Sequence, residues 1–195
     1  MMKRPVLRLL IGLVLLGSTV AGCANDGVPT AKWDSEPDVD VVDEAIGTQA
    51  VQRLAQPFLR SQQGANAGGA ESLRRVGAPV MVYATNPRFR DDVAPTLDSA
   101  GTASYIAVPV RIAGRAGTDT VQLASAPPYR PQAMATGDEE TGGPRGDARL
   151  LLDYPTHTWF AWTRTSVTVL SSGANPGLAG TEFDAAGFRV WLGAR

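Results

Sequence analysis

The chain has 195 residues, which is enough for one hydrophobic core, and a single domain is the default at this length. Its formal net charge is −1. Binding to nucleic acid relies on clustered Lys and Arg, so we expect no nucleic-acid partner. The chain contains one cysteine, which excludes an intramolecular disulfide and a metal site built from several cysteines.

The N-terminus has the three parts of a secretory signal. Met1 to Arg8 contain three basic residues and no acidic residue, and Leu9 to Leu16 form an apolar run. A segment of mostly small residues follows, and Gly22 and Cys23 are its last two residues. This order predicts export and cleavage. The apolar run is too short to cross a hydrocarbon core, which needs roughly 20 residues, so we expect no transmembrane anchor here.

The sequence Val20-Ala21-Gly22-Cys23 resembles the lipobox of bacterial lipoproteins. The resemblance implies that the Cys23 thiol receives a diacylglyceryl group and that cleavage occurs just before this residue. We therefore expect a signal peptide over 1–22, a lipidated flexible tether over 23–40 and attachment to the outer side of the cytoplasmic membrane. An ordinary signal peptide with a chance cysteine is the alternative. The only cysteine of the chain stands where a lipobox requires it, which favours the lipoprotein.

Removal of the signal peptide changes the charge of the protein. The loss of Lys3, Arg4 and Arg8 lowers the formal charge to about −4, and no polybasic patch remains for anionic lipid. We therefore expect the acyl chains on Cys23 to make the contact with the bilayer.

A helix is predicted over 41–63. Apolar residues recur there at every fourth position, and Asp40 can cap the helix. Pro57 should kink or split it. We expect the apolar stripe to pack on a sheet, although a helix that binds a partner has the same pattern.

The rest of the chain reads as strands and loops. A helical turn is expected near 71–76, and Asn86 and Pro87 can cap a short helix through Val93. Strands are predicted over 80–84, 103–112, 120–124, 149–154, 158–171 and 187–192, with a hairpin between the second and the third. Pro109 favours an edge strand or a bulge. Residues 127–147, rich in Pro, Gly and acidic residues, predict a long flexible loop.

These elements predict a single α+β domain over 41–195, in which one long N-terminal helix packs on a curved antiparallel sheet of five or six strands. The order of elements resembles the layout of NTF2-like and cystatin-like domains, some of which stand beyond membrane tethers. The resemblance lies in element order, with no shared motif, so it implies an architecture and no particular activity.

No catalytic motif is present. His157 is the only histidine, and neither Gly-x-Ser-x-Gly nor a phosphate-binding loop occurs. We expect no catalytic residue, no metal site and no cofactor. A pair of carboxylates facing each other in space would leave no sequence signature, and Asp153, Glu182 and Asp184 are the acidic residues left for such a pair.

Aromatic residues gather near the C-terminus. The candidate binding surface comprises Tyr154, Trp159, Phe160, Trp162 and Trp191, accompanied by Phe183 and Phe188. Neighbours on a strand point to opposite faces, so one core cannot contain all of them unless both faces are covered. We expect a non-catalytic envelope lipoprotein that binds another protein. The alternatives are a carrier or sensor of a small apolar molecule in a pocket between helix and sheet, and a carboxylate-based hydrolase of envelope glycans.

Overall fold

The computed structural model describes residues 36–63, 72–143 and 146–195. In chain order the elements are α1 (Val39–Ile46), α2 (Gln49–Gln63), β1 (Leu73–Arg75), β2 (Val80–Thr85), α3 (Pro87–Asp91), η1 (Leu97–Ser99), β3 (Gly101–Ile112), β4 (Asp119–Ala124), β5 (Pro131–Thr136), β6 (Arg149–Asp153), β7 (Thr158–Trp162), β8 (Val167–Ser172), η2 (Pro176–Leu178), β9 (Glu182–Phe183) and α4 (Ala185–Ala194). Cys23 and most of the predicted tether lie outside the described residues.

The described strands form one mixed sheet. Its order is β5-β4-β3-β2-β6-β7-β8-β9, and β1 pairs separately with β3. The pair β2–β6 is parallel and the other pairs are antiparallel. The predicted fold, a long helix on five or six antiparallel strands, is therefore wrong. The domain is mostly sheet, with nine strands and short helices.

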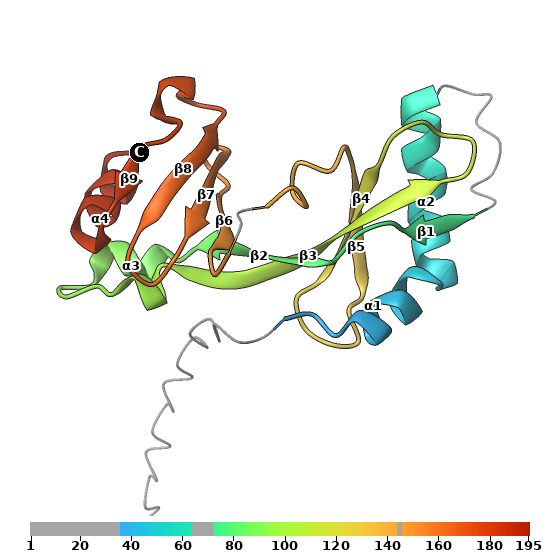
Figure 1. Cartoon of the computed structure of the whole chain (residues 1–195), viewed down its shortest axis with the longest axis horizontal. Coiled ribbons are helices and arrows are strands. Elements are labelled where there is room, and N and C mark those ends of the chain that lie inside the picture. The colour runs from blue at the N-terminus through green and yellow to red at the C-terminus, as the bar shows by residue number, and fades with distance from the viewer. Residues whose placement is uncertain (1–35, 64–71, 144–145) are drawn as a thin grey trace, which may run out of the picture.

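The two central strands, β2 and β3, run along the long axis of the molecule (Figure 1). Elements α1, α2, β1, β4 and β5 lie at one end of this axis, and α3, α4 and β6 to β9 lie at the other. The parallel ladder between Val82–Ala84 of β2 and Leu150–Leu152 of β6 joins the two halves of the sheet.

The predicted helix over 41–63 is in fact two helices. Helix α1 ends at Ile46, with Gly47 as its C-cap. The hydroxyl of Thr48 donates to the carbonyl of Ala45 at 2.7 Å, which occupies a carbonyl that a continuing helix would use. Pro57 lies inside α2 and does not split it. The break therefore occurs at Gly47-Thr48, ten residues before the proline expected to cause it.

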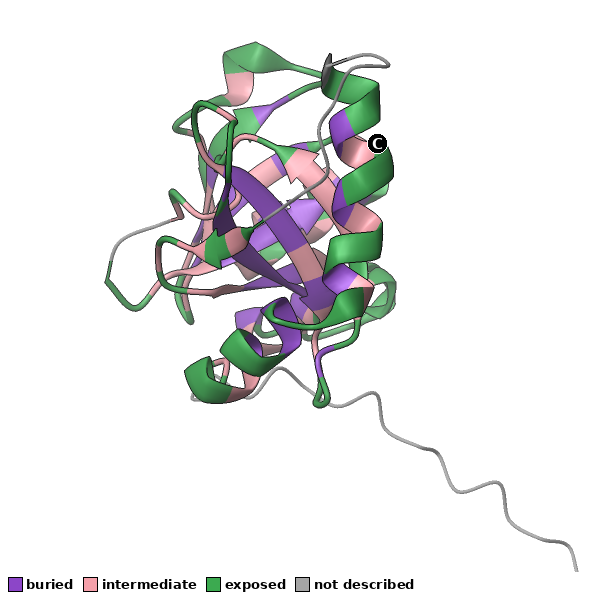
Figure 2. Ribbon diagram, turned by 90° about the vertical axis from the view of Figure 1, so that its right-hand side faces the viewer, coloured by how far each residue is buried: buried purple, intermediate pink, exposed green. Residues whose placement is uncertain are grey.

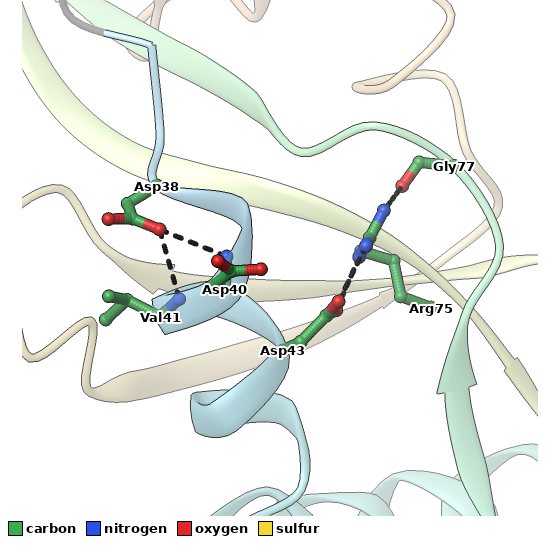
Figure 3. A network of polar contacts seen from close by, with 6 residues as sticks. All are labelled: Asp38, Asp40, Val41, Asp43, Arg75 and Gly77. Carbon is green, nitrogen blue, oxygen red and sulfur yellow. Dashed lines mark hydrogen bonds and ion pairs between the residues drawn. The ribbon is translucent and has the colours of Figure 1, made fainter.

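Polar side chains fix the start of α1 and tie it to the sheet. Asp38, and not the predicted Asp40, accepts from the backbone N–H groups at the helix start (Figure 3). Asp43 of α1 forms a two-bonded ion pair with Arg75 of β1, at 2.6 and 2.7 Å. Arg75 also donates to the carbonyl of Gly77 (Figure 3). The predicted tether, 23–40, therefore overlaps the start of α1, which begins at Val39 and is capped by Asp38.

Pro109 was expected in an edge strand or at a bulge, but it lies in the central strand β3, opposite Thr120 of β4 and without a register shift in that ladder. Its carbonyl accepts from the N–H of Val76 at 2.9 Å, in the break between β1 and β2. A Cβ on Gly77 would lie 2.9 Å from the Pro109 ring. On this side of β3, the pairing strands β1 and β2 are separated by a break beside Pro109, so the backbone N–H that proline lacks is not needed there.

The two faces of the sheet are covered differently. The face here called the helix face carries the main core, to which α1, α2 and α4 contribute buried side chains. Figure 2 shows the buried stretches of the sheet beside helix α2. The opposite face, here called the loop face, carries a smaller cluster made of Val82, Tyr105, Ala107, Leu150 and Leu152, with Val80 and Trp159 packed beside it. Both faces of the central strands are therefore apolar.

Several predicted elements are confirmed, and others change type. Strands β3 and β4 form the predicted hairpin, and Asn86 caps the short helix α3. The expected helical turn near 71–76 is β1. The expected last strand, 187–192, is the helix α4: Asp184 accepts from the N–H of Gly187 at 2.7 Å, and Phe188 and Leu192 are buried one turn apart.

The segment 127–147, expected to be a long loop, contains β5, which pairs with β4. Before it, the buried ring of Tyr129 fits into the main core, and its hydroxyl accepts from the N–H of Asp38 at 3.3 Å. A connection that looked unstructured by composition therefore supplies an edge strand.

Candidate functional site

Most of the predicted aromatic surface is core. Phe160 and Trp162 are fully buried on the helix face, and the indole N–H of Trp162 donates to the carbonyl of Leu97 at 2.9 Å. Trp191 is half-buried, and its ring stacks on that of Phe188 at 5.9 Å between centroids. Phe160 and Trp191 pack α4 on the sheet, and Trp162 packs against Tyr83, so these three side chains do not form a flat binding surface.

The other two predicted residues lie apart from that core. Tyr154 is exposed, and its hydroxyl shares a hydrogen bond of 2.9 Å with Ser104. Trp159 is half-buried on the loop face, beside the cluster of Leu150 and Leu152. The alternation along β7 thus sends Phe160 into the core and Trp159 to the opposite side.

Residues 138–143, here called the acidic loop, lie over the loop face. The sequence is Asp-Glu-Glu-Thr-Gly-Gly. Gly137 leads into it with φ 86°, a conformation that favours glycine. The hydroxyl of Thr120 donates to the carbonyl of Gly137 at 2.9 Å, and the carbonyl of Asp138 accepts from the N–H groups of Thr141 and Gly142 at 2.8 and 2.9 Å. These bonds give the loop a defined shape.

Glu140 fastens the acidic loop to the sheet. Its carboxylate accepts from the side-chain amide of Gln122 at 3.0 and 3.3 Å. Burial raises the pKa of Glu140, against the lowering effect of the neighbouring Tyr105 hydroxyl and of the Gln122 amide. Burial also raises the pKa of Tyr105, and the charge of Glu140 adds to that effect. The loop is therefore held by a carboxyl group that resists ionisation.

Three hollows surround the acidic loop. One, of about 360 Å³, is lined by Glu139, Gly142, Gly143, Leu150, Trp159, Leu170 and Ser171. A second, of about 290 Å³, lies between the loop, the start of β2 and residues 36–39, and a third, of about 300 Å³, lies beside Pro109 and Thr118. The first is here called the Trp159 hollow. It combines an aromatic ring, a carboxylate and apolar walls, which a binding site needs.

Asp153, one of the residues considered for catalysis, has a structural role. Asp153 is fully buried, pairs with Arg195 at 2.6 Å and accepts from the hydroxyls of Thr85 and Thr156 at 2.8 and 2.7 Å. His157 occupies the following turn with φ 47°. Within the described residues, no group of three or more His, Cys, Asp and Glu side chains could hold a metal ion.

Glu140, Gln122 and Glu139 were missed as site residues by sequence reasoning. Both glutamates lie in the segment expected to be a flexible loop, and Gln122 lies in a predicted strand. The available signal was Tyr105, because alternation along 103–112 puts it on the face opposite Ile106 and Val108. A strand that is apolar on both faces must be covered on both, and the acidic loop provides the second cover.

No helix among the described residues has the length and apolar character to cross a membrane. No family model, curated protein or solved structure matches the chain.

Proposed function

We propose that the protein is a lipid-anchored lipoprotein of the bacterial cell envelope that binds another protein through the loop face, without catalysis. The signal-like N-terminus and the lipobox-like Val20 to Cys23 support the anchor. The acyl chains on Cys23 would hold the domain at the extracytoplasmic surface of the membrane.

The observation that carries the binding role is the Trp159 hollow. Phe160, Trp162 and Phe188 are buried in the main core, whereas Trp159 is half-buried and lines a formed hollow on the face opposite the helices. Partly exposed tryptophans in hollows are common anchoring points for partners, because a large apolar area is buried when they are covered.

The rival role, carriage of an apolar molecule between helix and sheet, has less support. Val42 and Val51 from the helices and Val108 and Val121 from the strands are all fully buried in the same cluster. Protein side chains occupy this space, so a ligand would have to displace them.

Photo-crosslinking in intact cells tests the binding role. A photoreactive residue replaces Leu170, which is exposed at the rim of the Trp159 hollow, and in a control strain it replaces Val190, which is exposed on α4. We expect one protein adduct from position 170, its loss when Trp159→Ala is added, and no such adduct from position 190. Equal adducts from both positions, or none from position 170, would contradict the proposal.

The anchor is tested by Cys23→Ser. Without the thiol, no diacylglyceryl group can be attached, so we expect a variant that is either released from the membrane or left unprocessed. Membrane fractionation and the mass of the mature chain distinguish these states. A variant that remains on the membrane and is trimmed like the parent would show that the protein is not a lipoprotein.

A further inference from the structure

The floor of the Trp159 hollow is an aromatic surface with a free polar group. Trp159 packs beside Leu150 and Leu152, which hold the indole ring in place. Its indole N–H donates to none of the residues that the structure describes, whereas that of Trp162 is bonded to Leu97. The indole N–H and the exposed part of the ring are therefore available to a ligand in the hollow.

The wall of the hollow carries negative charge. Glu139 is exposed, and its side chain forms no ion pair with any described residue. It lies over Gly137, where a Cβ would come within 2.9 Å of its carboxyl carbon. Glycine at this position thus leaves room for the carboxylate. Asp138 precedes it, and no lysine or arginine is among the described residues that line the hollow.

The remaining walls suit a long side chain with a charged end. Leu150 and Leu170 are apolar, and the hydroxyl of Ser171 can accept a hydrogen bond. A guanidinium group stacks on the face of tryptophan and pairs with a carboxylate through two parallel bonds, and its methylene stem packs on apolar surface. At about 360 Å³ the hollow is at the small end of the range of ligand pockets, which fits one side chain better than an extended ligand.

We infer that the Trp159 hollow receives an arginine side chain of the protein partner, with Trp159 stacking on the guanidinium and Glu139 pairing with it. This inference rests on the proposed function and adds the chemistry of the contact. Glu140 does not touch the ligand. It positions the wall by fastening the acidic loop to Gln122.

The test is a titration of the full chain, in detergent micelles, with N-acetyl-arginine amide, followed by the nuclear magnetic resonance signals of the tryptophan indole N–H groups. The chain has four tryptophans, and Trp159→Leu assigns the relevant signal. The signal of Trp162, buried and bonded to Leu97, reports whether each variant is folded. The citrulline counterpart of the probe keeps the shape and loses the charge.

We expect a saturable shift of the Trp159 signal with the arginine probe, and about tenfold weaker binding of the citrulline probe. Glu139→Gln should weaken arginine binding about tenfold, while Glu182→Gln, an exposed carboxylate on β9, should leave it unchanged.

Three results would overturn the inference: equal binding of arginine and citrulline, no shift with either probe, or unchanged binding in Glu139→Gln. A shift with a neutral disaccharide but not with arginine would assign the hollow to a saccharide instead. If the cross-link from position 170 persists in intact cells while the arginine probe fails, the proposed function stands and this contact chemistry is wrong.

Discussion

Glu140 is the residue through which pH should act on the acidic loop. Its folded pKa is raised above the ordinary value of 4.5 because burial opposes ionisation. A carboxyl with a raised pKa stabilises the fold below its unfolded pKa, and this contribution is lost as the pH rises through the folded pKa. Within that window we expect the free energy of unfolding to fall as the pH increases.

Glu140→Gln should remove this fall, because an amide does not titrate and can still accept from Gln122. At neutral pH the variant should be at least as stable as the parent protein. Urea unfolding at a series of pH values measures both effects, with Glu182→Gln as the control. A parent protein and a Glu140→Gln variant with the same pH dependence would show that this carboxyl is not the titrating group.

Asp153 is a buried charge whose partners depend on it. Replacement by alanine leaves Arg195 and the hydroxyls of Thr85 and Thr156 without their acceptor. We expect Asp153→Ala to cost about 3–5 kcal/mol of unfolding free energy, the usual range for breaking a buried pair. Asp147→Ala, at an exposed carboxylate, is the matched control and should cost little. Similar unfolding midpoints for the two variants would contradict the role given to Asp153.

At the scale of elements, two glycines differ in whether a Cβ can be added. Gly47 lies at the break between α1 and α2, and Gly137 lies at the start of the acidic loop. Gly47 has φ −70° and ψ −9°, and a Cβ there would meet nothing closer than 3.5 Å. Gly47→Ala should therefore raise the free energy of unfolding by about 0.4–1 kcal/mol, because alanine restricts the unfolded chain. Gly137→Ala, at φ 86° and against Glu139, should lower it. Thermal unfolding compares the two, and a loss of stability in Gly47→Ala would show that the break needs glycine.

Elements with local signals were predictable from sequence. Asn86 marked α3, and alternation marked the β3–β4 hairpin. The error at 187–192 arose because apolar residues at alternating positions coincide there with Phe188 and Leu192, which are also one helical turn apart. The cap Asp184 was the signal that would have separated the two readings.

The elements that sequence reasoning missed depend on contacts distant in the chain. Strand β5 has few β-branched residues, and pairing with β4 makes it a strand. Of the proposed binding surface, sequence reasoning named Trp159 but not Glu139. The acidic loop that carries Glu139 is placed by Glu140, which bonds to Gln122 in a strand distant in the chain. Periodicity reports which side of a strand is apolar, and it does not report what covers that side.

For the molecule as a whole, the parallel β2–β6 ladder decides whether the two ends unfold together. Leu151, fully buried at that ladder, also belongs to the main core. Leu151→Ala should cost about 2–5 kcal/mol, whereas Leu170→Ala at the surface should cost little. Amide hydrogen exchange should show equal losses of protection in β4 and β8, because one sheet contains both. A loss confined to β8 would mean that the halves are separate cooperative units.

The same ladder has a consequence for the order in which the chain acquires its structure. Val82 pairs with Leu150, and 68 positions separate them (150 − 82). Until β6 has been synthesised, the N–H and C=O groups on one edge of β2 are unpaired, although β3 and β4 can already pair with each other. Closing so long a loop is slow compared with forming a hairpin, and an open edge invites pairing with other chains. Chains that stop before Arg149 should therefore associate with one another and not remain monomers, and the exposed edge of β2 is where they should join.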